Sequence, residues 1–151
     1  MRVVPFLTFS GICGAPNVYL FKPDDVRNMT SPGFPYAYPP DVSCSWVIIG
    51  RDEHRISIRI HRLMLERDFD VLTMGHGNNP KKTSFVRLTG TTAKLRIFTS
   101  EDSAMWMTFI TDNVVSMEGF FVEVKQVVDE TGENNGITFR NVKFVMLYCR
   151  P

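Results

Sequence analysis

The sequence lacks the features that mark three common classes of protein. No apolar segment approaches the roughly 20 consecutive residues that a membrane-spanning helix needs. The formal net charge is +1, and lysine and arginine occur singly or in pairs, so no global field attracts nucleic acid. No stretch combines helical periodicity with end caps. A membrane span, a nucleic-acid partner and a helical domain are therefore not expected.

Motifs of catalysis and of zinc binding are missing as well. Three cysteines are too few for a disulfide-rich miniprotein, and they form no CxxC or Cys/His pattern of a zinc site. His54, His61 and His76 are not spaced as metal ligands. No GxSxG turn presents a nucleophile. The sequence therefore predicts that this chain is not an enzyme.

What the chain does contain is short alternating segments separated by turns. Its 151 residues, 44% of them apolar, fit one domain of about 110 residues with short extensions. The clearest strand covers residues 54–65, where Ile56, Ile58 and Ile60 alternate with polar side chains. Further strands are expected at residues 69–74, around Leu95 and Ile97, and at residues 104–111 and 119–127. This pattern predicts an all-β fold, an antiparallel sandwich.

Residues 31–40 are rich in proline and form the most distinctive segment. Proline fixes φ and has no N–H to donate, so this segment is neither a helix nor a central strand. Its aromatic side chains Phe34, Tyr36 and Tyr38 would be costly to leave all in water. We expect a turn that packs on the β-core and leads into a strand over residues 45–50.

The string SPGFP..YP....CSW, which begins at Ser31, resembles the signature of the CUB domain, an extracellular β-sandwich that binds proteins or glycans. Three more blocks typical of that family follow in the same order. They are Leu65-Glu66 with Phe69-Asp70, then Leu88-Thr89-Gly90, then residues 103–109 with Thr111-Asp112 and Gly119-Phe120. The resemblance spans residues 13–128 and implies a jelly-roll sandwich like that of CUB domains and spermadhesins.

The same resemblance implies how the cysteines pair. In the family, the first disulfide joins a "CG" opening to a "C.W" strand, which corresponds here to Cys13 and Cys44. Such a bridge closes a loop of about 30 residues and contributes roughly 3 kcal/mol on the chain-entropy model. Both cysteines of the family's second disulfide are missing, and Thr89 stands at one of the two positions. Cys149 is left over, as a free thiol, a link to another chain, a buried apolar residue or part of a following module.

Three acidic residues stand where many family members bind Ca²⁺. The resemblance implies that Glu66, Asp70 and Asp112 are oxygen ligands to Ca²⁺ at one end of the sandwich. In the family, the same acids receive a lysine or arginine side chain of a protein partner. The alternative is structural, because Asp70 and Asp112 are also suited to capping turns and Glu66 to a solvated loop.

Two aromatic residues and one sequon are candidates for surface roles. Trp106 and Phe121 alternate opposite the predicted core positions, so they are expected to face outward and either anchor a partner or pack under a loop. Asn28-Met29-Thr30 is an acceptor for an N-linked glycan if the chain enters the secretory pathway.

The ends of the chain differ in character from its centre. Residues 1–12 pair an arginine with a short apolar run, as in part of a signal peptide, or else they mark a fragment or a misplaced start. Residues 129–151 begin as an acidic, glycine-bearing linker and turn apolar again as an extension. The domain itself is expected at residues 13–128.

The function expected from the resemblance is that of a secreted, non-catalytic protein-binding module. The first hypothesis is calcium-dependent recognition of an exposed lysine or arginine on an extracellular protein. The alternatives are a metal-free module that binds glycans or proteins, and an accessory domain of a secreted protease.

Overall fold

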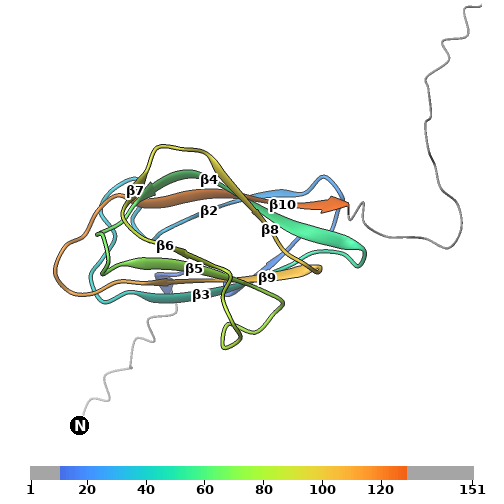
Figure 1. Ribbon diagram of the computed structural model, residues 1–151, viewed down its shortest axis with the longest axis horizontal. Coiled ribbons are helices and arrows are strands. Elements are labelled where there is room, and N and C mark those ends of the chain that lie inside the picture. The colour runs from blue at the N-terminus through green and yellow to red at the C-terminus, as the bar shows by residue number, and fades with distance from the viewer. Residues whose placement is uncertain (1–10, 129–151) are drawn as a thin grey trace, which may run out of the picture.

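The computed structural model describes residues 11–128, which form ten strands and no α-helix (Figure 1). One sheet has the order β1-β3-β9-β5-β6, and the other has the order β2-β10-β4-β7 with β8 also paired to β4. The strands of the first sheet are β1 (Asn17–Tyr19), β3 (Ser43–Ile49), β9 (Ala104–Ile110), β5 (Val71–His76) and β6 (Val86–Leu88). Those of the second are β2 (Val26–Thr30), β10 (Gly119–Val128), β4 (His54–Met64), β7 (Thr91–Thr92) and β8 (Arg96–Thr99).

The two sheets pack face to face, which confirms the predicted all-β sandwich. The strand predicted after the proline-rich turn is present as β3, and those predicted from residue patterns are present as β4, β5, β8, β9 and β10. Pairing is antiparallel throughout except for β1, which lies parallel to β3. The strands that alternation did not predict, β1, β2, β6 and β7, are short and each pairs with one neighbour only. A strand of two to five residues at an edge is too short to show a period of two.

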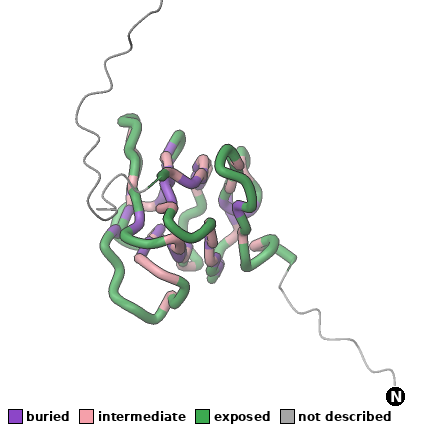
Figure 2. Tube along the Cα trace, turned by 90° about the vertical axis from the view of Figure 1, so that its right-hand side faces the viewer, coloured by how far each residue is buried: buried purple, intermediate pink, exposed green. Residues whose placement is uncertain are grey.

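The core lies between the sheets and is built from inward-facing apolar residues. Ile56, Ile58 and Ile60 of β4 are at most 1% exposed, as the alternation predicted. In the end-on view of Figure 2, exposed residues gather in the outer loops and buried ones toward the middle. Three edge-to-face ring contacts run through this core, Trp46 with Phe120, Phe120 with Phe109, and Phe109 with Tyr38. The core therefore extends from β3 into the proline-rich segment.

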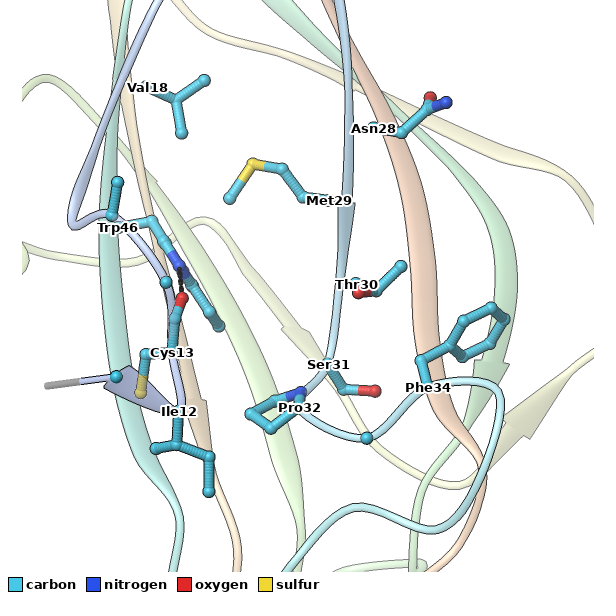
Figure 3. A pocket seen from close by; sticks show the side chains of 14 residues that line it. Ile12, Cys13, Val18, Asn28, Met29, Thr30, Ser31, Pro32, Phe34 and Trp46 are labelled. Atoms are coloured by element: carbon cyan, nitrogen blue, oxygen red, sulfur yellow. Dashed lines mark hydrogen bonds between the residues drawn. The ribbon is translucent and has the colours of Figure 1, made fainter. Parts of the chain in front are cut away.

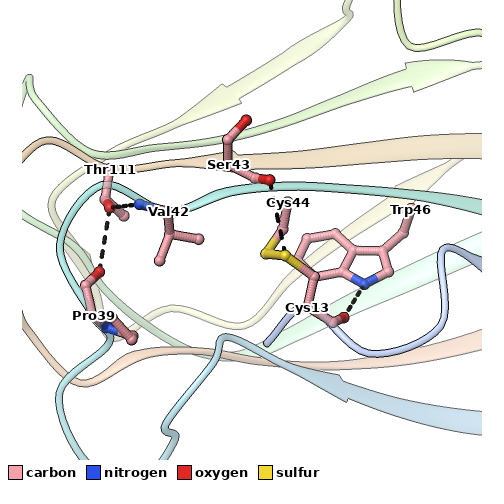
Figure 4. Close-up of a disulfide and its surroundings, with 7 residues drawn as sticks. All are labelled: Cys13, Pro39, Val42, Ser43, Cys44, Trp46 and Thr111. Atoms are coloured by element: carbon pink, nitrogen blue, oxygen red, sulfur yellow. Dashed lines mark hydrogen bonds between the residues drawn. A yellow bond between two sulfur atoms is a disulfide. The ribbon is translucent and has the colours of Figure 1, made fainter. Parts of the chain in front are cut away.

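The proline-rich turn packs on the core as predicted, chiefly through one of its three aromatic residues. Tyr38 is buried, Phe34 is half-buried, and Tyr36 is exposed. Gly33 has φ +80°, and a Cβ there would lie 2.8 Å from the carbonyl oxygen of Ala37, so the turn requires glycine. The hydroxyl of Thr111 accepts a hydrogen bond from the N–H of Val42 (2.8 Å) and holds the end of the turn against β9 (Figure 4).

A disulfide joins Cys13 to Cys44, which confirms the predicted pairing. The two Cα atoms lie 5.5 Å apart, and the indole N–H of Trp46 donates to the carbonyl oxygen of Cys13 at 2.8 Å (Figure 4). Together these contacts fix the start of the domain on β3. Cys149, the proposed leader up to residue 10, and residues 129–151 lie outside the described residues.

Trp106 faces away from the core, as predicted, but it is not exposed. Only 2% of its surface is accessible, so it cannot anchor a partner from the surface. The reason is Gly75, which pairs with Trp106 across β5 and β9 and leaves the space that the indole fills. A Cβ at Gly75 would lie 2.1 Å from the ring. The alternative of a packed outward aromatic is therefore the one that the structure supports for this residue.

This contact predicts that Gly75→Ala lowers the free energy of unfolding by about 2 kcal/mol, because the methyl group displaces the indole from a filled site. Urea unfolding followed by tryptophan fluorescence measures the change. Gly11→Ala is the matched control, since a Cβ there meets no atom within 4 Å. Equal stability of the Gly75→Ala variant and the wild type would contradict this account of Trp106.

Candidate metal centre

Three loops meet at one end of the sandwich, at the left of Figure 1. They connect β2 to β3 (residues 31–42), β4 to β5 (residues 65–70) and β9 to β10 (residues 111–118). The second loop brings Glu66 and Asp70 and the third brings Asp112, so that one carboxylate oxygen of each lies within 4.8 Å of the others. These are the three acids singled out from the sequence, and 46 positions separate the first from the last.

Asp70 is the buried member of the cluster, with no exposed surface. Its Oδ1 accepts a hydrogen bond from the backbone N–H of Asp112 at 2.9 Å, and its Oδ2 accepts one from the hydroxyl of Tyr38. The same hydroxyl accepts from the backbone N–H of Glu66 at 3.1 Å. Asp70 and Tyr38 therefore connect all three loops through a single network.

Tyr38 contacts the acid cluster, whereas its sequence context indicated only a packing role. Burial, followed by its hydrogen bond to Asp70, raises the pKa of Tyr38 to about 12. The hydroxyl therefore keeps its proton at neutral pH and remains a donor to the carboxylate. The signal was its place in the proline-rich motif, but the motif does not reveal that the ring reaches the acids.

Glu66 and Asp112 complete the cluster in different ways. The Oδ1 of Asp112 accepts from the backbone N–H of Val114 at 2.9 Å, which is the capping role of the structural alternative. The Oε2 of Glu66, in contrast, is buried and has no hydrogen-bond partner in the part of the chain that the structure describes. The Glu66 side chain as a whole is half-buried.

Several effects raise the pKa of Glu66 above its ordinary value. Loss of solvent is the largest, and the negative charges of Asp112 and then Asp70 add to it. A raised pKa in the folded state means that the stability contributed by protonated Glu66 is complete below its ordinary pKa and is lost as the pH rises through the raised value. The ionised form of Glu66 is therefore less favourable in the folded protein than in the unfolded chain, and a nearby cation would reverse this shift.

The donor set fits a hard cation such as Ca²⁺, which prefers carboxylate and carbonyl oxygens. Glu66 offers an oxygen that is already removed from water and unpartnered, and Asp112 offers its second oxygen. None of the three acids forms a salt bridge with a basic side chain within residues 11–128. Two roles thus coexist here, because Asp70 and Asp112 cap turns while the Oε2 of Glu66 is left without a hydrogen-bond partner.

Thr89 connects the two turns that lack the family's second disulfide. Its Oγ1 donates to the carbonyl oxygen of Glu66 at 3.1 Å and accepts from the backbone N–H of Asp68 at 2.7 Å. One hydroxyl therefore ties the turn after β6 to the loop that carries the acids. The sequence showed that both cysteines are missing. It did not show that the hydrogen bonds of Thr89 connect these two turns.

The remaining candidates lie away from this centre, on the second sheet. Phe121 is half-buried and packs between Phe34 and His61, with ring centroids 6.0 and 5.1 Å away. Asn28 is exposed on the edge strand β2. Figure 3 shows Asn28 and Thr30 on one side of β2 and Met29 on the other, toward Val18 and Trp46 across a groove of about 440 Å³. The acceptor side chain is therefore accessible.

The role of Thr89 predicts that Thr89→Val lowers the free energy of unfolding by about 1–2 kcal/mol, because the N–H of Asp68 and the carbonyl of Glu66 lose a shared partner. Urea unfolding at fixed pH measures the effect. Thr91→Val, at an exposed position of β7, is the control and should change stability little. The same effect from both substitutions would contradict a bridging role for Thr89.

Comparison with known proteins places this fold in a family. The chain is 30% identical to human Tolloid-like protein 2 over 112 residues, which cover 72% of the chain and 11% of that protein. It superposes on the extracellular region of zebrafish Gpr126/Adgrg6 with a TM-score of 0.65 and 27% identity, covering 76% of this chain and 15% of the other. The chain therefore spans about a tenth of the length of the curated relatives it matches.

A third neighbour shows the same fold at lower identity. The MASP-1 CUB2 domain bound to Ca²⁺ superposes with a TM-score of 0.60 at 15% identity, covering 72% of this chain and 96% of that domain.

No helix among residues 11–128 has the length and apolar character needed to cross a bilayer.

The model of the CUB domain family matches residues 16–124, most of the part that the structure describes. CUB domains are non-catalytic modules of protein interaction that occur in extracellular proteins, which confirms the prediction that this chain is not an enzyme. The chain belongs to the CUB domain family, as a divergent member whose described residues hold one disulfide, as expected from the absence of both cysteines of the family's second bridge.

Proposed function

We propose that this domain is a secreted module that uses Ca²⁺ to recognise a lysine or arginine side chain on an extracellular protein. The observation that carries the proposal is the buried and unpartnered Oε2 of Glu66, next to the carboxylates of Asp70 and Asp112. The structural neighbour solved with Ca²⁺, the MASP-1 CUB2 domain, supports it by its common fold. A buried anionic oxygen without a donor is costly, and a cation removes that cost.

In this proposal each acid has its own part. Glu66, Asp70 and Asp112 would hold the ion, and Tyr38 would keep the carboxylate of Asp70 in place through its hydrogen bond. When bound, Ca²⁺ supplies positive charge that relieves the repulsion among the three carboxylates. Carboxylate oxygens that stay accessible then accept charge-assisted hydrogen bonds from the partner's ammonium or guanidinium group.

A metal-free binding module is the second candidate, and one observation favours it. Both oxygens of Asp70 and one oxygen of Asp112 already have hydrogen-bond donors within the protein, so two of the three acids are partly satisfied without an ion. A glycan site built on exposed aromatics loses Trp106, which is buried. An accessory role in a secreted protease stays a prediction.

The calcium site predicts measurable heat of binding when Ca²⁺ is titrated into chelator-treated protein. Asp112→Ala should weaken the affinity at least about tenfold, because a charged ligand is lost. Saturation at about 100 times the dissociation constant should raise the free energy of unfolding by about 2.7 kcal/mol. Asp24→Ala, an exposed acid in the turn between β1 and β2, is the control and should bind as the wild type does. If the wild type shows neither heat of binding nor added stability with Ca²⁺, the calcium site is refuted and the metal-free module remains as the proposed function.

Secretion and the accessible sequon predict an N-linked glycan on Asn28. Expressed through the secretory pathway of animal cells, the wild type should have an intact mass above that of its sequence, and deglycosylation should remove the excess. Thr30→Ala should lack the added mass because it destroys the sequon, whereas Thr99→Ala, on another exposed edge of the same sheet, should keep it. A secreted wild type with the bare polypeptide mass would refute this site.

A further inference from the structure

We propose that the partner presents its basic residue from an apolar patch of its own surface, so that leucine-like neighbours flank the lysine or arginine. The inference rests on the proposed function and adds the chemistry that surrounds the basic side chain. It follows from the apolar rim, the exposed side chains of Phe69, Val114 and Val115, which lie in the two loops that carry the acids, within one to three positions of Asp70 or Asp112.

Phe69 lies inside the loop that carries two of the acids. The loop is closed by a hydrogen bond from the N–H of Asp70 to the carbonyl oxygen of Glu66 at 3.2 Å. Phe69 is next to Asp70 in the chain, yet 63% of it is exposed while Asp70 is completely buried. The loop therefore sends its acid inward and its aromatic ring outward at the same end of the sandwich.

Val114 and Val115 flank the acids from the opposite loop. The N–H of Val114 donates to the Oδ1 of Asp112 at 2.9 Å, and Val115 follows it in the same loop. Their side chains are 73% and 45% exposed. The hydrogen bond of Val114 holds this part of the loop beside Asp112, so the valines do not lie at a remote loop tip.

Charge and hydrophobicity at this end complement one kind of ligand. Lysine and arginine have a long aliphatic stem below the charge, and apolar side chains around an acidic site can pack on that stem and on its neighbours. Excluding water from the rim strengthens the attraction between the cation and the carboxylates. A basic residue with polar neighbours would leave the apolar rim exposed to solvent. Apolar neighbours would bury Phe69 and the two valines on binding.

The test uses two capped pentapeptides, Gly-Leu-Lys-Leu-Gly and Gly-Ser-Lys-Ser-Gly, titrated into ¹⁵N-labelled protein with saturating Ca²⁺ and followed by amide chemical shifts. We expect the leucine-flanked peptide to bind about tenfold more tightly, from the apolar area it covers. Phe69→Ser and Val114→Ser, both at exposed positions, should each reduce this preference. Ile97→Ser is the matched control, since Ile97 is 51% exposed but lies on β8 opposite Arg59, away from the three loops, and it should keep the preference.

The possible failures separate the inference from the proposed function. Equal affinity of the two lysine peptides, with calcium still required, would overturn the apolar partner and leave the calcium-dependent recognition intact. An unchanged preference in both Phe69→Ser and Val114→Ser would overturn the rim as its cause. A peptide with norleucine in place of lysine that binds equally well, or no binding by either lysine peptide, would overturn both proposals.

Discussion

The buried carboxylate of Asp70 is the constraint on which this end of the molecule depends. A carboxylate without access to water needs donors at its oxygens, and here the hydroxyl of Tyr38 and the N–H of Asp112 provide them. Each donor comes from a different loop, so satisfying one buried charge also sets the positions of the other two. The acid cluster is therefore a consequence of the hydrogen bonds that Asp70 requires. These bonds satisfy Asp70 but leave the Oε2 of Glu66 without a partner.

The core extends this constraint through the whole sandwich. Tyr38 meets Phe109 edge to face, Phe109 meets Phe120, and Phe120 meets Trp46 beside the disulfide. These contacts run between the two sheets, so the tyrosine that orients Asp70 is part of the main core and not of a separate loop. The loops are exposed, but Tyr38 packs on the core and holds Asp70 in position. A binding site built on these loops can therefore have a defined geometry.

The loss of the second disulfide changes how firmly the acid-bearing loop is held. A disulfide typically contributes 2–4 kcal/mol, whereas the hydrogen bonds of Thr89 are worth about 1 kcal/mol each. The loop at residues 65–70 is accordingly held by Thr89, by Tyr38 and by its own turn. In the proposed Ca²⁺-bound state, the ion would connect this loop to the loop of Asp112. It would thereby stabilise a loop that no disulfide holds.

The sequence by itself determined the fold class and six of the ten strands found among residues 11–128, and its resemblance to the CUB family implied the disulfide and the three acids, because alternation and ordered motifs are local properties of the chain. The sequence did not predict the short edge strands β1, β2, β6 and β7, since two to five residues are too few to show a period of two. Only the tertiary structure decided which neighbours each side chain meets. Trp106 faces outward as its alternation says, yet it is buried because Gly75 lies beside it on another strand. Tyr38 and Thr89 bear on the acids through contacts across 32 and 23 positions, which no local pattern records.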